Sequence, residues 1–558
     1  MPAKSLYPDV EIPDVGLWDF LFERKDRDFP EDKVIFAEAS KSNRTYTFAS
    51  LKSAATDFGK GLKGAWDWQT GDVLGIFSAN SIDVPAVAWG CHYAGGVVSP
   101  ANPAYTADEL AFQLKDSGAK ALVTQAPQIP IAREACQKVG IPENRIILLG
   151  EEKDPSGGFK HFTSIRNISG TQRFRRTKVA SPADDLAFLV YSSGTTGLPK
   201  GVMLTHRNIV ANTLMISAAE SEQLSWKPRP DFPEGDVLLS MLPLYHVYGL
   251  TVVLHQSFYK GTKTVIMPKF EIETFCDLVQ THRVTFAYVV PPIVLLLAKH
   301  PIVSKYNLST IRMMNSGAAP LTKELVDAVH DRINVPVKQG YGLSETSPTT
   351  HTQPWGLWRS TIGSVGLMLP NQTAKYMSPE DTEVPVGETG ELWIKGPNVF
   401  KGYLNNEKGT ANALTDDGYF KTGDVGHQDS EGNFYITDRV KELIKYKGFQ
   451  VPPAELEGKL AAHPSISDVA VLGVFKEEQA TEVPLAYVVP NAGVTPSPKL
   501  EKEIVDWLAE RVAGHKRLRG GVKFTDEIPK SAAGKILRRV LKGRYEEAEA
   551  KNSTKAKL

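Results

Sequence analysis

A short loop around residues 191–201 combines glycine, hydroxyl and lysine side chains in a way that suits phosphate binding. It reads Tyr-Ser-Ser-Gly-Thr-Thr-Gly-Leu-Pro-Lys-Gly and lies between an apolar run at 186–191 and a second strand-like run at 201–206. Glycines let backbone N–H groups approach an anion closely, and Lys200 adds a positive charge on a flexible stem. A plain hairpin turn is the alternative for such a loop. A Walker loop is excluded because Pro199 precedes Lys200 and a strand, rather than a helix, follows.

A second group of residues could hold a nucleotide. The segment 339–346 reads Gln-Gly-Tyr-Gly-Leu-Ser-Glu-Thr, so glycines flank Tyr341 and leave its aromatic face open to a planar ligand. Glu345 offers the kind of oxygen ligand that Mg²⁺ takes in addition to phosphate oxygens. Asp424, in Tyr-Phe-Lys-Thr-Gly-Asp, could accept hydrogen bonds from both hydroxyls of a ribose. In isolation Glu345 would be interpreted as a solvated acid and Asp424 as a turn residue.

Two basic segments follow toward the C-terminus. Residues 438–450 read Asp-Arg-Val-Lys-Glu-Leu-Ile-Lys-Tyr-Lys-Gly-Phe-Gln, and residues 529–539 read Pro-Lys-Ser-Ala-Ala-Gly-Lys-Ile-Leu-Arg-Arg. A basic run is usually a solvated face, and Lys535 by itself would be a surface lysine. Gly534, however, gives the backbone before Lys535 the freedom to swing the ammonium group into a pocket.

Taken together and in this order, the motifs closely resemble those of the adenylate-forming enzymes. These include acyl- and aryl-CoA synthetases, 4-coumarate–CoA ligases, beetle luciferases and the adenylation domains of peptide synthetases. The resemblance covers nearly the whole chain and is closest to 4-coumarate–CoA ligase-like enzymes. It implies an ATP-dependent ligase that converts a carboxylic acid to acyl-AMP, with release of pyrophosphate. The acyl group then passes to coenzyme A, and AMP is released.

The resemblance also implies roles for individual residues. Catalysis would fall to Lys535, Lys445, Gln450, Thr196 and Glu345, with Glu345 as the magnesium ligand. ATP and AMP would be bound by Ser192, Ser193, Gly194, Thr195, Thr196, Lys200, Gln339, Gly340, Tyr341, Ser344, Asp424, Arg439, Lys441 and Lys535. The acyl pocket would be formed by His246, Tyr248, Gly317, Ala318 and Gly340. Coenzyme A would contact Lys260, Lys447 and Gly448, although Lys260 taken alone is better explained as a surface lysine. The sequence departs from many relatives at Ser344, where they have Thr, and at Lys441, a pivot that some relatives fill with Asp.

Other functions fit parts of the same pattern. A luciferase-type oxidoreductase would share the adenylation step and then use O₂. A non-catalytic nucleotide-binding relative is disfavoured because no candidate catalytic residue is missing, and a peptide-synthetase module because no carrier segment follows Lys535. The acid is left open between aryl acids, such as hydroxycinnamate, benzoate or phenylacetate, and a medium-chain fatty acid. Small residues such as Gly249 suggest room for the acid, and His351 could add polarity to the pocket floor.

The elements that must position these residues follow an α/β pattern. Strand-like runs at 73–78, 96–100 and 121–124 alternate with helical patterns at 84–95 and 107–117, which predicts layered sheets with largely parallel strands. Further strands are expected at 238–242, 264–267, 285–290 and 311–315. Asn208 is expected to cap a helix over 209–219. The apolar stretch 286–298 is too short for a bilayer and is broken by Pro291-Pro292, so it is interpreted as a strand and a core helix.

From Gly363 onward, closely spaced glycine turns predict a small antiparallel β section. The resemblance then implies a mobile α+β lid domain. The expected boundaries are an AMP-binding domain over 1–437, a hinge at 438–441, the lid over 442–545 and a polar tail over 546–558.

Composition narrows the partners and the compartment. At 558 residues the chain should form at least two domains, and 64 basic residues balance 64 acidic ones, which does not suggest a nucleic-acid partner. The three cysteines show neither zinc nor disulfide spacing. The final Ala556-Lys557-Leu558 is similar to the peroxisomal Ser-Lys-Leu signal, which predicts an import receptor as a partner and a peroxisomal location, with the cytoplasm as the alternative.

Overall fold

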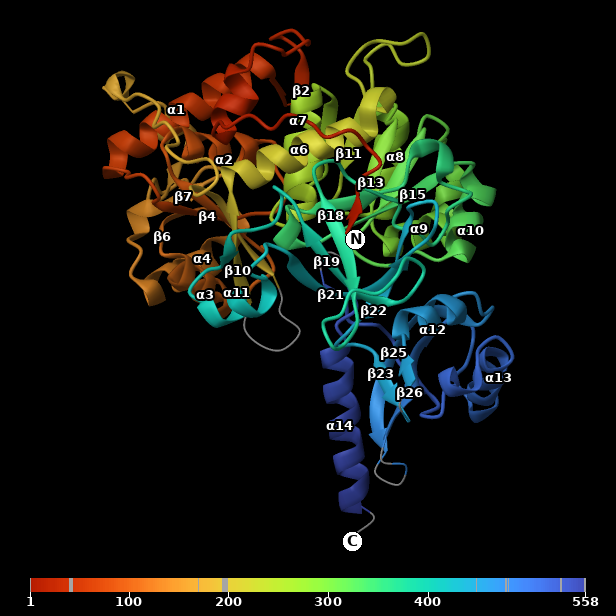
Figure 1. The fold of residues 1–558 in the computed structure, drawn as a ribbon. Helices are drawn as coiled ribbons and strands as arrows, with labels where there is room; N and C mark the ends of the chain where they lie inside the picture. Colours follow the sequence, from red (N-terminus) through yellow and green to blue (C-terminus); the bar gives the residue numbers. More distant parts are fainter. Residues whose placement is uncertain are drawn as a thin grey trace.

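The computed structural model describes residues 2–39, 44–168, 170–192, 199–447, 449–476, 479, 481–531 and 534–555, with side chains to Glu549. The chain forms a large N-terminal part, in which helices pack on layered sheets, and a smaller C-terminal unit below it (Figure 1). The predicted α/β class is therefore confirmed. In the described residues no helix has both the length and the apolar character needed to cross a bilayer.

The first sheet is mainly parallel and includes β9 and β10, which flank the segment predicted to bind phosphate. Its strands, in spatial order, are β20 (Gly402–Tyr403), β10 (Lys200–Thr205), β9 (Leu186–Ser192), β5 (Val97–Ala101), β4 (Val73–Phe77), β6 (Ala119–Thr124), β7 (Ile146–Leu148) and β8 (Lys160–His161). Every residue of β4 and β5 is buried, as expected for parallel strands covered on both faces. The associated helices are α1 (Phe48–Trp66), α2 (Asp83–Tyr93), α3 (Ala107–Ser117), α4 (Ile129–Val139) and α5 (Phe162–Arg166).

The second sheet carries, at the ends of several of its strands, the segments predicted to bind the nucleotide and the acid. Its order is β17 (Leu367–Met368), β16 (Thr349–Thr352), β15 (Val337–Gly342), β14 (Met313–Ser316), β13 (Phe286–Val289), β11 (Val237–Ser240), β12 (Lys263–Ile266), β2 (Val34–Glu38) and β3 (Thr45–Thr47). The helices around it are α6 (His206–Glu220), α7 (Ser257–Lys260), α8 (Ile272–His282), α9 (Pro291–Lys299) and α10 (Lys323–Ile333). The apolar stretch 286–298 thus forms β13 and α9, which confirms the prediction of a strand followed by a helix.

The predicted cap of α6 is wrong by one turn. The helix begins at His206, and Thr205 is the N-cap because its side chain accepts a hydrogen bond from the Asn208 N–H. Asn208 is the reciprocal member of this capping box, since its Oδ1 accepts from the Thr205 N–H. The sequence contains both residues of the box, and the prediction chose the second of them.

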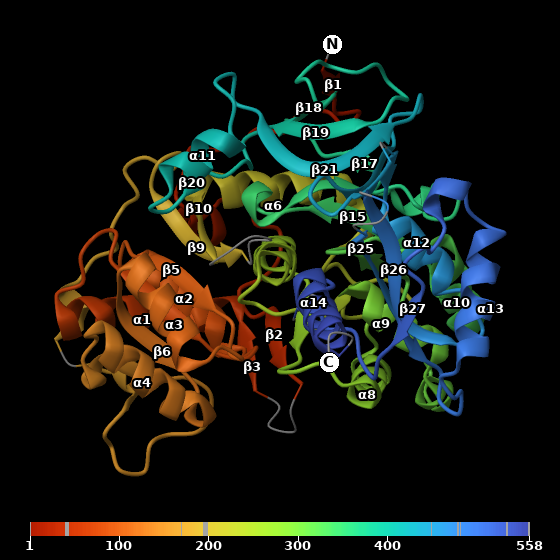
Figure 2. The same ribbon diagram turned by 90° about the horizontal axis from the view of Figure 1, so that it is seen from below.

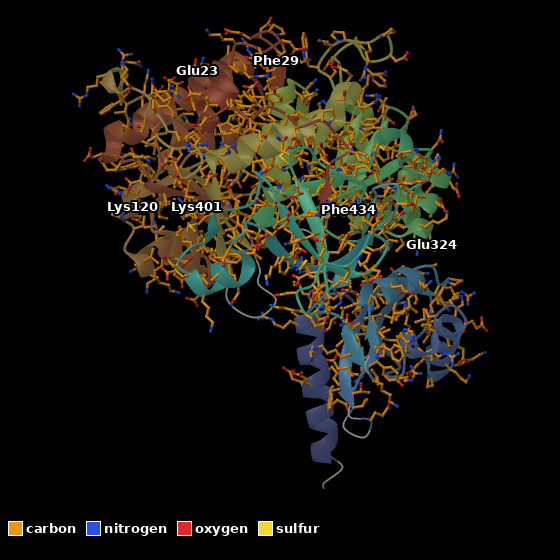
Figure 3. The ribbon with its side chains drawn as sticks, in the orientation of Figure 1. Glu23, Phe29, Lys120, Glu324, Lys401 and Phe434 are labelled. Atoms are coloured by element: carbon orange, nitrogen blue, oxygen red, sulfur yellow. The ribbon has the colours of Figure 1, made fainter. Side chains whose placement is uncertain are left out.

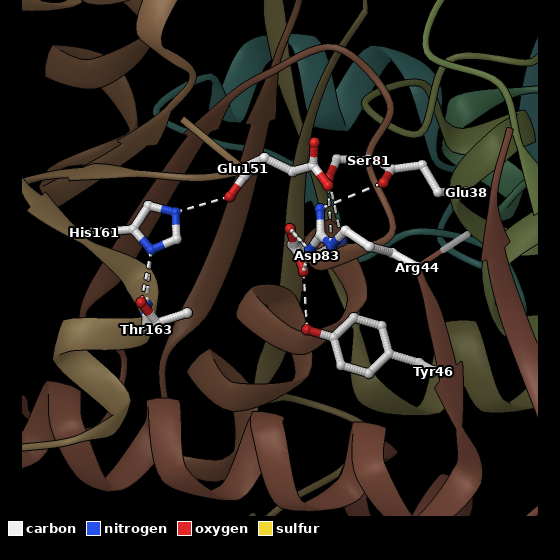
Figure 4. A network of polar contacts seen from close by, with 9 residues as sticks. Glu38, Arg44, Tyr46, Ser81, Asp83, Glu151, His161 and Thr163 are labelled. Atoms are coloured by element: carbon white, nitrogen blue, oxygen red, sulfur yellow. Dashed lines mark hydrogen bonds and ion pairs between the residues drawn. The ribbon is translucent and has the colours of Figure 1, made fainter. Parts of the chain in front are cut away.

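Polar side chains join the two sheets where apolar packing alone would not fix their angle. Arg44 pairs with Asp83 at the start of α2 at 2.7 Å, and the Tyr46 hydroxyl donates to the same carboxylate at 2.8 Å (Figure 4). Asp83 is fully buried, so it depends on these partners. Asn80 forms a second link, because its amide donates to Leu242 O and accepts from Leu244 N.

A third, antiparallel sheet and the C-terminal unit complete the fold. The sheet contains β1 (Ala3–Lys4), β18 (Thr373–Met377), β19 (Gly390–Lys395), β21 (Phe420–Gln428) and β22 (Phe434–Arg439), with α11 (Glu407–Ala413) nearby. It confirms the β section predicted from the glycine turns. Phe434, the first residue of β22, is buried, whereas Lys120 and Glu324 are exposed on the N-terminal part (Figure 3).

The C-terminal unit has a hydrophobic core of its own. Its elements are β23 (Ile444–Tyr446), β24 (Phe449–Val451), α12 (Pro453–Leu460), β25 (Ile466–Lys476), β26 (Thr481–Pro490), α13 (Pro498–Ala509), β27 (Val522–Phe524) and α14 (Arg538–Lys555). Of these elements, α12 and α13 lie closest to α10, as the view from below also shows (Figure 2). Across this boundary the Lys299 ammonium donates to Ile466 O, and α14 projects away from the body (Figure 1).

Candidate active site

Two cavities meet between the N-terminal part and the C-terminal unit. The His246 cavity, of about 680 Å³, contains His246, Tyr248, Gly317, Lys200 and Glu345 in its wall. The Asp424 cavity, of about 700 Å³, contains Gln339, Asp424, Ile436 and Glu442. The residues common to both walls are Ala318, Gly340, Tyr341, Gly342, Arg439 and Lys535. The structure therefore brings most of the sequence-predicted residues to one continuous space.

The wall of the His246 cavity is fixed by backbone contacts. Asn80 holds the loop after β11 by its bonds to residues 242 and 244, and this loop delivers His246 and Tyr248. The Tyr248 hydroxyl donates to Asn315 O at 3.1 Å, and a Cβ on Gly317 would lie 3.0 Å from the Tyr248 ring. Burial lowers the pKa of His246 to about 4, so its imidazole is neutral at physiological pH. This region thus combines an uncharged imidazole and an aromatic ring, which suits an organic acid.

A cationic and an acidic group lie at the other end of this cavity. Lys200 and Ser192 face each other in the β9–β10 register, and the Lys200 ammonium lies 4.7 Å from the centre of the Tyr403 ring. The Tyr403 hydroxyl donates to Glu345 Oε1 at 2.9 Å. Ser193, Gly194, Thr195 and Thr196 lie outside the described residues. Sequence reasoning missed Tyr403, which reaches the site only because β20 pairs with β10.

Glu345 is the one metal-ligand candidate proposed from the sequence. In the described part of the chain no three His, Cys, Asp or Glu side chains converge as a metal cage. A single carboxylate in the same cavity as Lys200 and Ser192 instead fits a cation that takes its other ligands from phosphate and water, as Mg²⁺ does.

In the Asp424 cavity an aromatic ring, a carboxylate and a guanidinium are held together. The Tyr341 hydroxyl donates to Asp424 Oδ2 at 2.5 Å, and Arg439 Nε lies 3.1 Å from Asp424 Oδ1. Asp424 and Arg439 are cross-strand partners in β21 and β22. Burial raises the pKa of the Asp424 carboxyl, whereas Arg439 acts in the opposite direction. When the oxygen and nitrogen of the Gln339 side-chain amide are exchanged so that both are satisfied, the amide donates to Leu321 O and accepts from Gly363 N. Tyr341 is therefore held in place by its hydrogen bond to Asp424, next to the Asp424–Arg439 ion pair.

Lys535 reaches the junction of the two cavities from the C-terminal unit. It lies on a tight turn in which Gly534 N donates to Ser531 O and Ser531 N donates to Lys535 O, both at 2.8 Å. Gly534 has φ +79°, and a Cβ there would lie 3.3 Å from Pro292. Burial lowers the pKa of the Lys535 ammonium and Arg439 lowers it further, while Glu442 and Asp424 act in the opposite direction. Its Nζ lies 3.8 Å from Glu442 Oε1.

The remaining predicted residues divide into two groups. Ser344 and Lys441 line the His246 cavity. Lys445 and Gln450 are cross-strand partners in β23 and β24, and both are exposed, as is Lys447. None of these three lines either cavity. Gly448 lies outside the described residues. The structure thus presents Lys535, and not the β23–β24 hairpin, to the cleft.

Lys260 lines neither cavity, and its ammonium donates to Ser221 O at 2.9 Å, so its contact with coenzyme A stays a prediction. Two other expectations about position are wrong. His351 is fully buried against Phe434, with ring centres 4.2 Å apart, so it is not part of the pocket floor. Gly249 packs on backbone rather than opening the pocket, since a Cβ there would lie 2.2 Å from Pro243 O.

Comparisons with known proteins agree with this geometry. Residues 22–404 match the family model of AMP-binding enzymes, and residues 455–535 match that of the AMP-binding enzyme C-terminal domain. The chain is 37% identical to a probable 4-coumarate–CoA ligase 1 of Dictyostelium discoideum, over 96% of this chain and 97% of that protein. It is 38% identical to a 4-coumarate–CoA ligase of Pinus taeda, over 97% of each. A crystal structure of ATP-bound MatB from Rhodopseudomonas palustris superposes with a TM-score of 0.83 at 29% identity, covering 96% of this chain and 100% of that one.

Proposed function

The chain belongs to the family of AMP-binding enzymes, and from this membership we propose how its two cavities share one reaction. The protein is an AMP-forming acid–thiol ligase, which activates an acyl or aryl carboxylic acid with ATP and transfers it to coenzyme A. The acid occupies the part of the His246 cavity that His246, Tyr248 and Gly317 line, and the adenosine occupies the Asp424 cavity. The β- and γ-phosphates reach the part of the His246 cavity that Ser192 and Lys200 line. The observation that supports this division is the position of Lys535, which lines both cavities where they meet.

In the first step the adenine stacks on Tyr341, and the ribose hydroxyls donate to Asp424. A carboxylate oxygen of the acid attacks the α-phosphorus, the bond to pyrophosphate breaks, and acyl-AMP forms. Both the acid and ATP are anions and repel each other, so a positive charge is needed where the carboxylate approaches the α-phosphate. Lys535 bridges the acid and the α-phosphate, and its charge favours the transition state more than either separated reactant.

Lys200 and Ser192 bind the β- and γ-phosphates together with Ser193, Gly194, Thr195 and Thr196. Glu345 would hold Mg²⁺, which when bound would neutralise part of the charge of the phosphates. Tyr403 orients Glu345 by donating to its Oε1.

In the second step the thiol of coenzyme A attacks the acyl carbon, the bond to AMP breaks, and the thiol proton is lost to solvent. Lys535 occupies the junction in the present orientation, so a path for the thiol requires the C-terminal unit to turn. The turn takes place at a hinge of residues 438–441, between domains at 1–437 and 442–545. It brings Lys445, Gln450, Lys447 and Gly448 to the cleft.

Replacing Lys441 with proline should separate the two steps. Lys441 N makes no backbone hydrogen bond to another described residue, while its neighbours Val440 and Glu442 donate to Gly423 O and Arg439 O. Proline would therefore fix φ at the pivot without removing a bond. We expect thioester formation to slow by about tenfold or more and adenylate formation to change less, since hinge changes act on the closing motion. Rapid-quench assays of each half-reaction measure this, and an equal loss in both would contradict the hinge.

A panel of carboxylic acids tests the function and identifies the substrate class. We propose an aryl acid, because the relatives of this chain are named 4-coumarate–CoA ligases and Tyr248 offers an aromatic wall. Hydroxycinnamate, benzoate, phenylacetate and a medium-chain fatty acid would each be mixed with ATP and coenzyme A. Pyrophosphate release that depends on the acid, followed by thioester formation, is the expected result. Absence of both with every acid would contradict the proposal.

We also propose that Ala556-Lys557-Leu558, where it forms the end of the protein, directs import into peroxisomes through the receptor for such tripeptides. A fluorescent protein fused before residue 546, so that the native tripeptide remains terminal, should collect in peroxisomes. The same fusion ending in Ala556-Lys557-Glu is the control. A diffuse pattern for both fusions would contradict this location.

A further inference from the structure

The Lys535 ammonium is accompanied by one carboxylate from its own domain. Glu442 Oε1 lies 3.8 Å from Lys535 Nζ, and Glu442 Oε2 pairs with Arg538. Glu442 also lines the Asp424 cavity, immediately after the hinge residues. The mechanism described above uses Lys535 but assigns nothing to this carboxylate.

Glu442 is held in place by a buried network inside the C-terminal unit. Arg538 donates to both oxygens of Glu457, at 2.7 and 2.6 Å, and to Val471 O at 3.0 Å. Glu457 in turn accepts from Val471 N at 2.7 Å. The network therefore ties α12, β25 and α14 to Glu442, so the carboxylate that faces Lys535 cannot move away freely.

We propose that Glu442 is a positioning residue that holds the Lys535 ammonium at the junction of the two cavities until the acid and the α-phosphate arrive. This inference rests on the proposed function, because it concerns the lysine that acts in adenylate formation. Glu442 need not contact either substrate. It acts through Lys535, and the incoming anions then replace it as the partner of the ammonium group.

The charges around Lys535 explain why such a partner matters. The positive charges of Arg439 on β22 and Arg538 on α14 lower the pKa of the Lys535 ammonium, and burial lowers it as well. Among the described residues, Glu442 and, from β21, Asp424 act in the opposite direction. Asp424 is already paired with Arg439 and Tyr341. Removing the charge of Glu442 therefore lowers the pKa of Lys535 further, and the ammonium form is lost at a lower pH than in the wild type.

The test compares Glu442→Gln with Glu457→Gln in the full-length protein. Both glutamates bind Arg538, but only Glu442 lies beside Lys535, so the pair separates positioning from packing. The rate of pyrophosphate release is measured from neutral to alkaline pH. For Glu442→Gln we expect a rate at least about tenfold lower, since the ammonium is no longer oriented. We also expect the alkaline limb of the pH–rate profile, where the rate falls as Lys535 loses its proton, to be displaced to lower pH. Glu457→Gln should leave the limb in place, and Glu442→Asp should restore it.

Thioester formation from preformed acyl-AMP, which does not need Lys535, reports whether each variant is folded. Equal displacement of the limb by Glu442→Gln and Glu457→Gln, or no displacement by Glu442→Gln, would overturn the inference. A wild type that releases no pyrophosphate with any acid would instead contradict the proposed function, so the two failures are distinguishable.

Discussion

Replacing Lys535 with alanine should slow adenylate formation by about 10²- to 10³-fold, the usual loss when one charge-stabilising donor is removed from a reacting centre. Lys535 is the lysine that lines both cavities at their junction, and its turn is pressed against Pro292 by Gly534. The same variant, supplied with preformed acyl-AMP, should still form the CoA thioester, because that step requires Lys535 to leave the junction. Rapid-quench measurement of the two half-reactions gives both rates.

Lys530→Ala is a matched control for this experiment. Lys530 lies in the same hairpin, but its ammonium pairs with Asp468 at 2.6 Å within the C-terminal unit. We expect a much smaller change in adenylate formation for this variant. If Lys535→Ala lost both half-reactions to the same extent, the assignment of Lys535 to the first step alone would fail.

Replacing Lys338 with methionine should lower the free energy of unfolding by about 3–5 kcal/mol, because it leaves a buried carboxylate without its counter-charge. Lys338 and Glu220 are each only 1% exposed at the side chain. Lys338 also donates to Thr352 Oγ1 at 3.0 Å, while Glu220 accepts from Trp355 Nε1 at 2.6 Å. Urea denaturation, followed through the transition of the N-terminal part, measures the effect as a lower midpoint.

Two further variants make this result specific. Like Lys338 with Glu220, Lys323 forms an ion pair with Asp327, but the Lys323 side chain is 66% exposed. Lys323→Met should therefore change stability by about 1 kcal/mol or less. The double variant Lys338→Met/Glu220→Gln should recover part of the loss, because glutamine removes the unpaired charge and can still accept from Trp355. Equal losses for Lys338→Met and Lys323→Met would contradict the argument.

Helices and strands could be predicted from the sequence where the spacing of apolar residues within one short segment determines them. The helix expected at 107–117 is α3 over the same residues, and the strand and helix expected within 286–298 are β13 and α9. Motif order also predicted which segments would share a site, since residues as distant as His246 and Lys535 line one cavity. In each case the information lies in short stretches of side chains with a fixed spacing.

What could not be predicted depends on distant partners. Tyr403 lies outside every motif and becomes a site residue only through strand pairing with β10. His351 was expected in the pocket, but its ring packs against Phe434, more than eighty positions away. Likewise, 438–450 and 529–539 both contain candidate catalytic lysines, and their sequences do not say which one faces the cleft in a given orientation. That choice is made by the docking of a whole domain.

The two-cavity arrangement has a consequence for how this protein can change its chemistry over evolutionary time. His246, Tyr248 and Gly317 line the His246 cavity alone, whereas Gln339 and Asp424 line the Asp424 cavity alone. Substitutions in the first set can alter which acid is accepted without disturbing the residues proposed to hold the nucleotide. Tyr341 and Lys535 line both cavities, so a substitution of either residue alters both halves of the site. Acid preference is therefore free to diverge between closely related chains, while ATP use remains constrained.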